Sequence, residues 1–368
     1  MLRSGVPVPF AERGGALRGL LDVATGCYPA FLFGGSIGAQ VPVFHFHDEP
    51  RPWLERRLQY LADNGYRTIT SDEIARFVID GVAPGPRAVA LTFDDAWASV
   101  WTVAFPLLKQ YSLRATVFAI PGRIGDAPAA PDPRRTEDGF VTWSQLREMH
   151  ASGVVDVQSH TQWHVMIFSS ATLAGFVTPS FAAESMLNRP LMSPTTGGCP
   201  RFLEAEALGA PLFVRRSRMS DARRFVPDGR AEDHCRDIVA KNGGEAFFAR
   251  PDWRAVLKSA AAGAGGHYES EAERTAVIRE ELSRGREELN ARLGIQSVKH
   301  IALPWGIAGA LASSLLAETG HTTAFAERPL QRRAIRAGDD RFRLMRLNGK
   351  FVTCLPGRQR QWFFTTVR

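Results

Sequence analysis

The chain has few of the features that mark disulfide-stabilised or membrane-spanning proteins. It contains only 4 cysteines in 368 residues, far apart in sequence and without a CxxC pair. Neither a zinc knuckle nor a disulfide framework is therefore predicted. Its most apolar early stretch, Phe31-Leu-Phe-Gly-Gly35, is glycine-broken and far shorter than the roughly 20 residues that cross a bilayer. The N-terminus also lacks a clear apolar signal region. We expect a soluble, cytoplasmic protein without a transmembrane segment.

The charge pattern excludes a typical nucleic-acid binder. There are 45 Lys and Arg against 38 Asp and Glu, a net charge of +7. The sequence has no long basic block and no interleaving of basic and aromatic residues, so no nucleic-acid partner is predicted. The excess is compatible with an acidic or anionic partner. A composition of 45% hydrophobic residues is ordinary for a folded protein that buries a full core.

The chain alternates between short apolar runs and helical patterns. The expected strands are 41–47, 88–95, 115–120, 154–157, 300–306 and 322–326, and the expected helices 53–63, 70–80, 97–111, 142–149, 269–293 and 308–319. Such alternation predicts an α/β fold with a parallel sheet or barrel. In these folds ligands bind at the C-terminal ends of the strands. Residues 1–40 are interpreted as an N-terminal extension to a domain over 41–368. Residues 165–267 break the pattern. They are rich in Pro, Arg, Gly and Ser with few clear periodic segments, and are interpreted as a large insertion rather than an independent domain.

The run Ala88-Val-Ala-Leu-Thr-Phe-Asp-Asp95 ends in two adjacent carboxylates. Because neighbouring strand residues point to opposite faces, Asp94 and Asp95 cannot play the same part. One interpretation is an acidic turn or helix cap. The other is a site in which one carboxylate binds a metal ion and its neighbour acts beside it.

Histidines follow two other predicted strands. His160 and His164 come after the strand at 154–157, and their spacing of four would place both on one face of a helical turn, within reach of one cation. That spacing also occurs by chance. His45 and His47 share a face near the end of the first strand, where they are either structural or part of a site. Two imidazoles with one carboxylate leave metal positions open for water and substrate, as hydrolysis requires.

Several motifs together resemble one known family, the carbohydrate esterase family 4 polysaccharide deacetylases. The resemblance covers roughly residues 41–165 and 270–350. Its carriers are Pro42-Val-Phe-His-Phe-His47, Asn64-Gly-Tyr-Arg-Thr68, Leu91-Thr-Phe-Asp-Asp95, Phe105-Pro-Leu-Leu108, Ala115-Thr-Val-Phe118, Thr142-Trp143, Ser159-His-Thr161 with His164, and Leu303-Pro-Trp-Gly306.

The resemblance implies a distorted (β/α) barrel that hydrolyses an N-acetyl, or occasionally O-acetyl, group on a carbohydrate. It implies Asp94 as the general base, and a divalent metal ion, expected to be Zn²⁺, bound by Asp95, His160 and His164. The backbone N–H of Trp305 would face the developing oxyanion, a contribution of ~3 kcal/mol.

Two expected residues are missing. Ile301 and Ala302 stand where the family has an arginine that orients the base, so Asp94 is expected to lack such a partner. The segment Leu344-Met-Arg-Leu-Asn-Gly349 contains no histidine, although the family takes its general acid from a C-terminal Leu-x-His. We hypothesise that His47 replaces this acid or that water supplies the proton.

Three functional alternatives remain at this level. The first is the metal-dependent deacetylase, and the second a degenerate relative that binds acetylated glycans without turnover. The third, a two-carboxylate glycosidase, fits poorly because its carboxyl groups must flank a sugar rather than adjoin each other.

The arginines at 215–224 would bind a phosphate or uronate group of a ligand, or simply form a solvated basic loop. The sequence does not identify the sugar or the oligomeric state.

Overall fold

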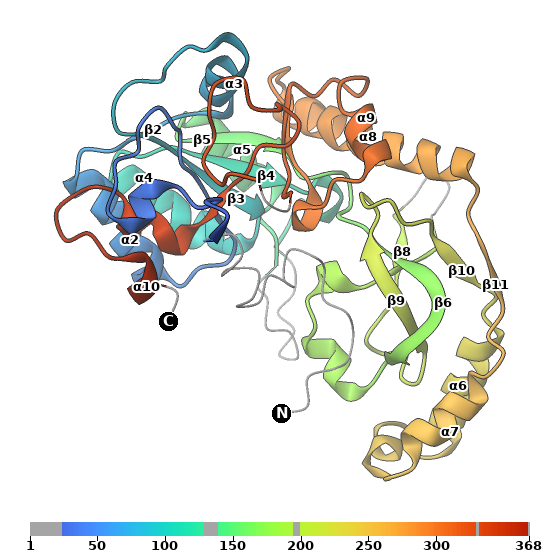
Figure 1. Cartoon of the computed structure of the whole chain (residues 1–368). Coiled ribbons are helices and arrows are strands. Elements are labelled where there is room, and N and C mark those ends of the chain that lie inside the picture. Colours follow the sequence, from blue (N-terminus) through green and yellow to red (C-terminus); the bar gives the residue numbers. More distant parts are fainter. Residues whose placement is uncertain (1–23, 129–138, 194–198, 329–330, 367–368) are drawn as a thin grey trace. The chain divides into compact units, whose positions relative to one another are not determined.

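The computed structural model of the chain describes residues 24–128, 139–193, 199–328 and 331–366. These residues belong to two compact units (Figure 1). Of the described residues, the barrel unit comprises 24–128, 139–163, 279–328 and 331–366, and the insert unit 164–193 and 199–278. Of the predicted N-terminal extension, residues 1–23 lie outside the described part of the chain.

The barrel unit is built on one curled, parallel eight-stranded sheet, so the predicted α/β barrel architecture is confirmed. The strand order is β13-β12-β5-β4-β3-β1-β14, with β2 paired to β3. The strands are β1 (Val43–Phe46), β2 (Arg67–Thr68), β3 (Ala88–Asp95), β4 (Ala115–Ala119), β5 (Val155–Ser159), β12 (His300–Ala302), β13 (Thr323–Phe325) and β14 (Leu347–Asn348). Strands β3, β4 and β5 lie side by side in Figure 1.

A short C-terminal segment connects the two ends of this sheet. Leu344 donates its N–H to Ala324 O at 3.0 Å and accepts from Ala326 N at 3.1 Å, beside β13. Three residues later, Leu347 of β14 pairs with Phe44 of β1. The residues between these contacts therefore lie where the curled sheet closes, and Arg346 is one of them.

Alternation along the central strand sorts its side chains between two cores. Val89, Leu91 and Phe93 join the apolar core that packs against α2, α4 and α5. Ala88 and Ala90 join a second core with residues of β4, β12 and β13, inside the curl of the sheet. Thr92 and Asp94 follow on this inner side because strand side chains repeat with a period of two.

The helices of the barrel unit follow the expected pattern. They are α2 (Arg51–Asp63), α3 (Ser71–Asp80), α4 (Phe105–Gln110), α5 (Trp143–Ala151), the C-terminal half of α8 (Glu271–Leu293), α9 (Ala310–Leu315) and α10 (Phe363–Thr366). The sequence pattern of a capping box, Thr-x-x-Glu or Thr-x-x-Gln, occurs at Thr70 with Glu73 and at Thr142 with Gln145, and both boxes are formed and begin α3 and α5. Among the residues that the structure describes, none of the helices has the length and apolarity needed to cross a membrane.

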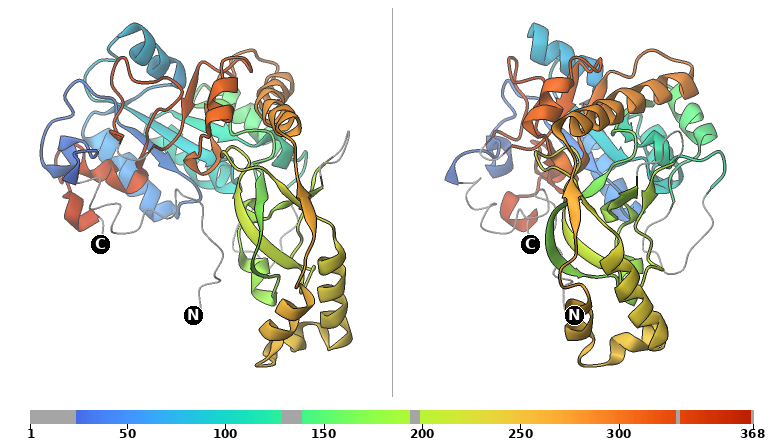
Figure 2. Two further views of the ribbon diagram at one scale, coloured as in Figure 1. Left: turned by 45° about the vertical axis from the view of Figure 1, so that its right-hand side comes forward. Right: turned by 90° about the vertical axis from the view of Figure 1, so that its right-hand side faces the viewer.

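The insert unit is more regular than its sequence predicts. Its described residues form three antiparallel pairs, β6 (Met166–Phe176) with β9 (Pro211–Ser217), β7 (Leu191–Ser193) with β8 (Arg201–Phe202), and β10 (Phe225–Pro227) with β11 (Gly266–Tyr268). Helices α6 (Arg230–Lys241) and α7 (Trp253–Ala260) complete it (Figure 2). Register shifts in β6 interrupt the alternation that marks a strand, so the sequence of this unit shows few clear periodic segments.

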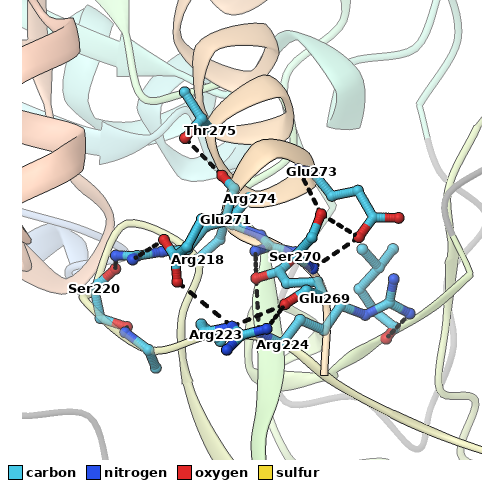
Figure 3. A network of polar contacts seen from close by, with 12 residues as sticks. Arg218, Ser220, Arg223, Arg224, Glu269, Ser270, Glu271, Glu273, Arg274 and Thr275 are labelled. Carbon is cyan, nitrogen blue, oxygen red and sulfur yellow. Dashed lines mark hydrogen bonds and ion pairs between the residues drawn. The ribbon is translucent and has the colours of Figure 1, made fainter. Parts of the chain in front are cut away.

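The arginines of this unit hold its segments together. The Arg218 side chain is 1% exposed and pairs with Glu269 at 2.6 Å, and the backbone N–H of Arg224 donates to the same carboxylate at 2.7 Å (Figure 3). The Arg224 side chain donates to the carbonyl oxygen of Met192 at 2.6 Å. The interpretation as a solvated basic loop is therefore wrong for these buried groups, which bond within the unit.

Candidate metal and catalytic site

Three side chains with metal-binding atoms meet at the C-terminal end of the sheet. The ligating atoms of Asp95, His160 and His164 all lie within 4.8 Å of one another, and all three residues are buried. Asp95 is the last residue of β3, and His160 directly follows β5. The structure thus brings together the three residues that the sequence predicts as metal ligands, at the edge where α/β folds place their ligands.

The backbone at Asp95, which directs its side chain towards the two histidines, has an unusual conformation. Asp95 and the following Ala96 both have positive φ values, 69° and 61°, which L-residues adopt rarely. Its Oδ1 lies 3.4 Å from His160 Nε2, and its Oδ2 accepts a hydrogen bond of 3.0 Å from the indole N–H of Trp97. The two oxygens of the carboxylate therefore have different partners.

His160 is held in the tautomer that a metal ligand needs. Its Nδ1 lies 2.7 Å from the carbonyl oxygen of Ala302. A carbonyl can only accept, so Nδ1 carries the proton and Nε2 faces the cluster, the arrangement typical of metal-bound histidines. Burial opposes protonation of His160, but the hydrogen bond with Asp95 and the charge of Asp94 outweigh it and raise its pKa.

The two histidines are brought together by a loop, and the prediction of a helical turn is wrong. Residues 160–165 are not helical, and Thr161 and His164 have positive φ values of 66° and 56°. The loop is fixed by α8. Glu281 accepts from Gln162 N through its carbonyl at 2.9 Å and from Trp163 N through its carboxylate at 3.0 Å.

A glycine in α8 permits this close approach. A Cβ added to Gly285 would lie 2.8 Å from the carbonyl carbon of Thr161 and 2.9 Å from Gln162 N. Glycine inside a helix costs about 1 kcal/mol relative to alanine, so its presence there is a signal of close packing. Sequence reasoning missed it.

Asp94 has an arginine partner, so the prediction that the base lacks one is wrong. Arg346 donates to both oxygens of Asp94, from Nη1 at 2.6 Å and from Nη2 at 2.7 Å. Nη1 also lies 3.0 Å from Thr92 Oγ1. The guanidinium lies 5.6 Å from the ring centroids of Phe118 and Phe325, on the inner side of the barrel.

This pairing keeps Asp94 ionised although it is buried. Burial alone would raise the pKa of Asp94, but the charge of Arg346, reinforced by His160 and by the hydrogen bonds from Arg346, lowers it well below the ordinary range. The Arg346 signal was present in the sequence as a charged residue between apolar neighbours in Leu344-Met-Arg-Leu347. The same segment is notable in the sequence for its lack of a histidine, which does not indicate that its arginine pairs with Asp94.

His47 lies on the open side of this carboxylate. Its Nε2 is 3.8 Å from Asp94 Oδ2, and its side chain is 50% exposed. His45 packs edge-on against it, with ring centroids 5.6 Å apart. Burial first, and then the charge of Arg346, lower the pKa of His45 to about 3, so this ring is neutral at ordinary pH. A ring nitrogen of each histidine lies within 4.8 Å of a carboxylate oxygen of Asp94, and of the two His47 is the more exposed to solvent.

Trp305 lies in a tight turn after β12. Its φ and ψ of 54° and 18° are left-handed, within the short 3₁₀ segment Pro304–Gly306. The turn begins two residues after Ala302, whose carbonyl fixes His160. The predicted contact of the Trp305 N–H with an oxyanion stays a prediction.

The donor set fits a divalent cation. Two imidazole nitrogens and one carboxylate oxygen are a ligand set of catalytic zinc sites, which keep further positions open, and here these atoms are buried and lie within 4.8 Å of one another. Asp94 is not needed as a fourth ligand, because Arg346 already binds both of its oxygens.

The family model and the curated relatives that this chain matches are all polysaccharide deacetylases. The family model described as polysaccharide deacetylase matches residues 81–201. Poly-β-1,6-N-acetyl-D-glucosamine N-deacetylases from Escherichia coli K12 and Staphylococcus epidermidis are 27% identical over 201 residues and 30% identical over 108 residues. These matches cover 53% and 29% of this chain and 30% and 35% of the relatives. The chain therefore spans well under half of the length of these curated relatives.

Solved structures support the fold. A de-N-acetylase from Aggregatibacter actinomycetemcomitans aligns over 84% of this chain and 95% of its own, with a TM-score of 0.52 and 18% identity. The BpsB deacetylase domain from Bordetella bronchiseptica aligns over 85% and 97%, with a TM-score of 0.51 and 21% identity. Residues 81–201 of this chain thus match the polysaccharide deacetylase family, and its fold is similar to that of solved deacetylases.

Proposed function

We propose that the protein is a metal-dependent hydrolase that removes an acetyl group, most directly an N-acetyl group, from a sugar of a polysaccharide, oligosaccharide or lipid-linked glycan. The observation that carries this proposal is the separation of two adjacent carboxylates. Asp95 is directed to His160 and His164, and Asp94 is bound by Arg346. One carboxylate is thereby available as a metal ligand and the other as a base.

The residues of the site suit the parts that amide hydrolysis requires. Asp95, His160 and His164 would hold the cation, with zinc the ion that this ligand set favours. When bound, such a cation polarises the acetyl carbonyl and lowers the pKa of the attacking water. Asp94 is ionised and oriented, so it can accept the proton that the water loses on attack.

The remaining steps concern the amide nitrogen and its oxygen. As the carbonyl carbon becomes tetrahedral, its oxygen gains negative charge, which the backbone N–H of Trp305 is proposed to stabilise. Breakage of the C–N bond then requires a proton on the leaving nitrogen. His47, exposed and beside Asp94, is proposed as that donor. The products are acetate and a free amino sugar.

The names of the relatives suggest the substrate. Several are poly-β-1,6-N-acetyl-D-glucosamine N-deacetylases, so a β-1,6-linked N-acetylglucosamine oligomer is the first substrate to try. The alternative of a non-catalytic glycan binder rested on a missing arginine and a missing histidine acid. Arg346 removes the first of these reasons.

The test is acetate release from N-acetylated glucosamine oligomers, with the products identified by mass spectrometry. We expect wild-type protein to release acetate and Asp94→Asn to be inactive while still binding metal. Glycan binding by the wild type without any acetate release, at any divalent ion tried, would support the binder instead.

A further inference from the structure

We infer that Trp97 is a positioning residue for the metal ligand Asp95, and that it restricts this carboxylate to one coordinating oxygen. The inference rests on the proposed function, because it assumes that Asp95 binds the cation. It starts from the hydrogen bond between Trp97 Nε1 and Asp95 Oδ2, at 3.0 Å. Both residues are buried.

The hydrogen bond distinguishes the two oxygens of Asp95. Oδ2 is held by the indole N–H, and Oδ1 is the oxygen that faces His160, at 3.4 Å from Nε2. An oxygen that accepts from a fixed N–H is turned towards that donor and away from the metal. Outer hydrogen bonds of this kind orient the ligands of metal sites.

Trp97 is itself fixed by packing and by the backbone. Its indole stacks on Phe140, with ring centroids 4.5 Å apart and an angle of 15° between the planes. On either side of Trp97, Ala98 N donates to Gly139 O at 2.7 Å and Val141 N donates to Ala96 O at 3.0 Å. Trp97 is thus paired to the 139–141 segment by backbone hydrogen bonds on both sides, and its indole cannot swing away without breaking the stack.

This support also stabilises a turn that is otherwise unfavourable. Asp95 and Ala96 both have positive φ, a conformation that persists only where the surroundings enforce it. The backbone pairing of residues 96–98 with 139–141 enforces it immediately after the ligand. Trp97 therefore contributes a donor to the carboxylate and an anchor to the turn that presents it.

The test is metal binding by Trp97→Phe, which keeps a ring for stacking on Phe140 but removes the N–H. Metal-free protein would be titrated with Co²⁺ and with Zn²⁺ against a chromophoric chelator. We expect the dissociation constants to rise about 10- to 100-fold, the usual effect of losing an outer partner. The freed carboxylate can then use both oxygens, so the visible Co²⁺ absorption should weaken as the coordination number increases.

Two controls separate positioning from packing. Trp143→Phe makes the same substitution at another buried tryptophan of the barrel unit, in α5, and should leave the Co²⁺ affinity and spectrum unchanged. Phe140→Leu removes the stack but keeps the N–H, and should weaken binding less than Trp97→Phe.

An affinity and a Co²⁺ spectrum equal to wild type in Trp97→Phe would overturn the inference while leaving the proposed function intact. A loss in Phe140→Leu or Trp143→Phe as large as in Trp97→Phe would also overturn it, since the effect would then be one of packing. Failure of the wild type to bind either metal would instead contradict the proposed function, and the inference with it.

Discussion

Removal of the Arg346 guanidinium should disable the base without removing the metal ligands. In Arg346→Ala, Asp94 loses two charge-assisted hydrogen bonds of 2.6 and 2.7 Å. The Arg346 and Asp94 side chains are only 10% and 5% exposed, so water cannot fully replace these bonds. Breaking a buried ion pair by deleting one partner costs about 3–5 kcal/mol, and we expect the free energy of unfolding to fall by about that amount.

Catalysis should fall as well, because a misplaced catalytic group typically loses on the order of 100-fold in rate. The assay is acetate release at saturating metal, measured with and without added guanidinium. Guanidinium can enter the space left by the side chain, so it should restore part of the rate. Arg346→Lys, which keeps the charge but cannot bind both oxygens at once, should lie between the wild type and Arg346→Ala.

Arg343→Ala is the matched control, three residues earlier in the same segment. Its side chain hydrogen-bonds Ser313 rather than Asp94, so its rate should stay near wild type and not respond to guanidinium. A wild-type rate for Arg346→Ala, or a loss that guanidinium does not restore, would refute the role given to Arg346.

Three further predictions concern the acid, the buried histidine and the glycine of α8. His47→Gln should lower kcat by about 100- to 10,000-fold at unchanged metal content, as expected for loss of a general acid; an unchanged kcat would assign the proton to water. Burial lowers the pKa of His321 from 6.5 to about 3. Between pH 6.5 and about pH 3 the unfolded chain therefore binds one proton more at this residue than the folded protein does. Stability should therefore fall as the pH drops below 6.5, by roughly 1.4 kcal/mol per pH unit from this group, and equilibrium unfolding of His321→Gln should show a correspondingly shallower pH dependence. Gly285→Ala should push on the backbone at Thr161, lowering stability by about 1–3 kcal/mol and weakening metal binding in a Zn²⁺ titration; unchanged values would mean that α8 does not hold the loop.

The sequence predicted the parts of the fold that depend on local patterns. Alternating strands and helices gave the α/β barrel, and the capping boxes at Thr70 and Thr142 gave the starts of α3 and α5. The insert unit was less predictable, since the register shifts of β6 hide its period. Its buried arginines could not be assigned because their partners, such as Glu269, lie far along the chain.

The candidate site likewise has features that the sequence predicts and features that only the structure shows. The cluster of Asp95, His160 and His164 could be predicted because motifs at the ends of parallel strands converge on one edge. The spacing of the two histidines suggested a helical turn, but positive φ values and contacts with α8 form a loop instead. Arg346 could not be paired with Asp94 from sequence, because the two are 252 residues apart and the barrel must close before they meet.

Acetate release as a function of added zinc tests the central claim most directly. Metal-free protein would receive increasing zinc in the presence of an N-acetylglucosamine oligomer, with His160→Ala in parallel. We predict no release without metal, a rise that ends at one zinc per chain, and little release from His160→Ala at that ratio. Full release from metal-free protein, or a wild-type response in His160→Ala, would contradict the account.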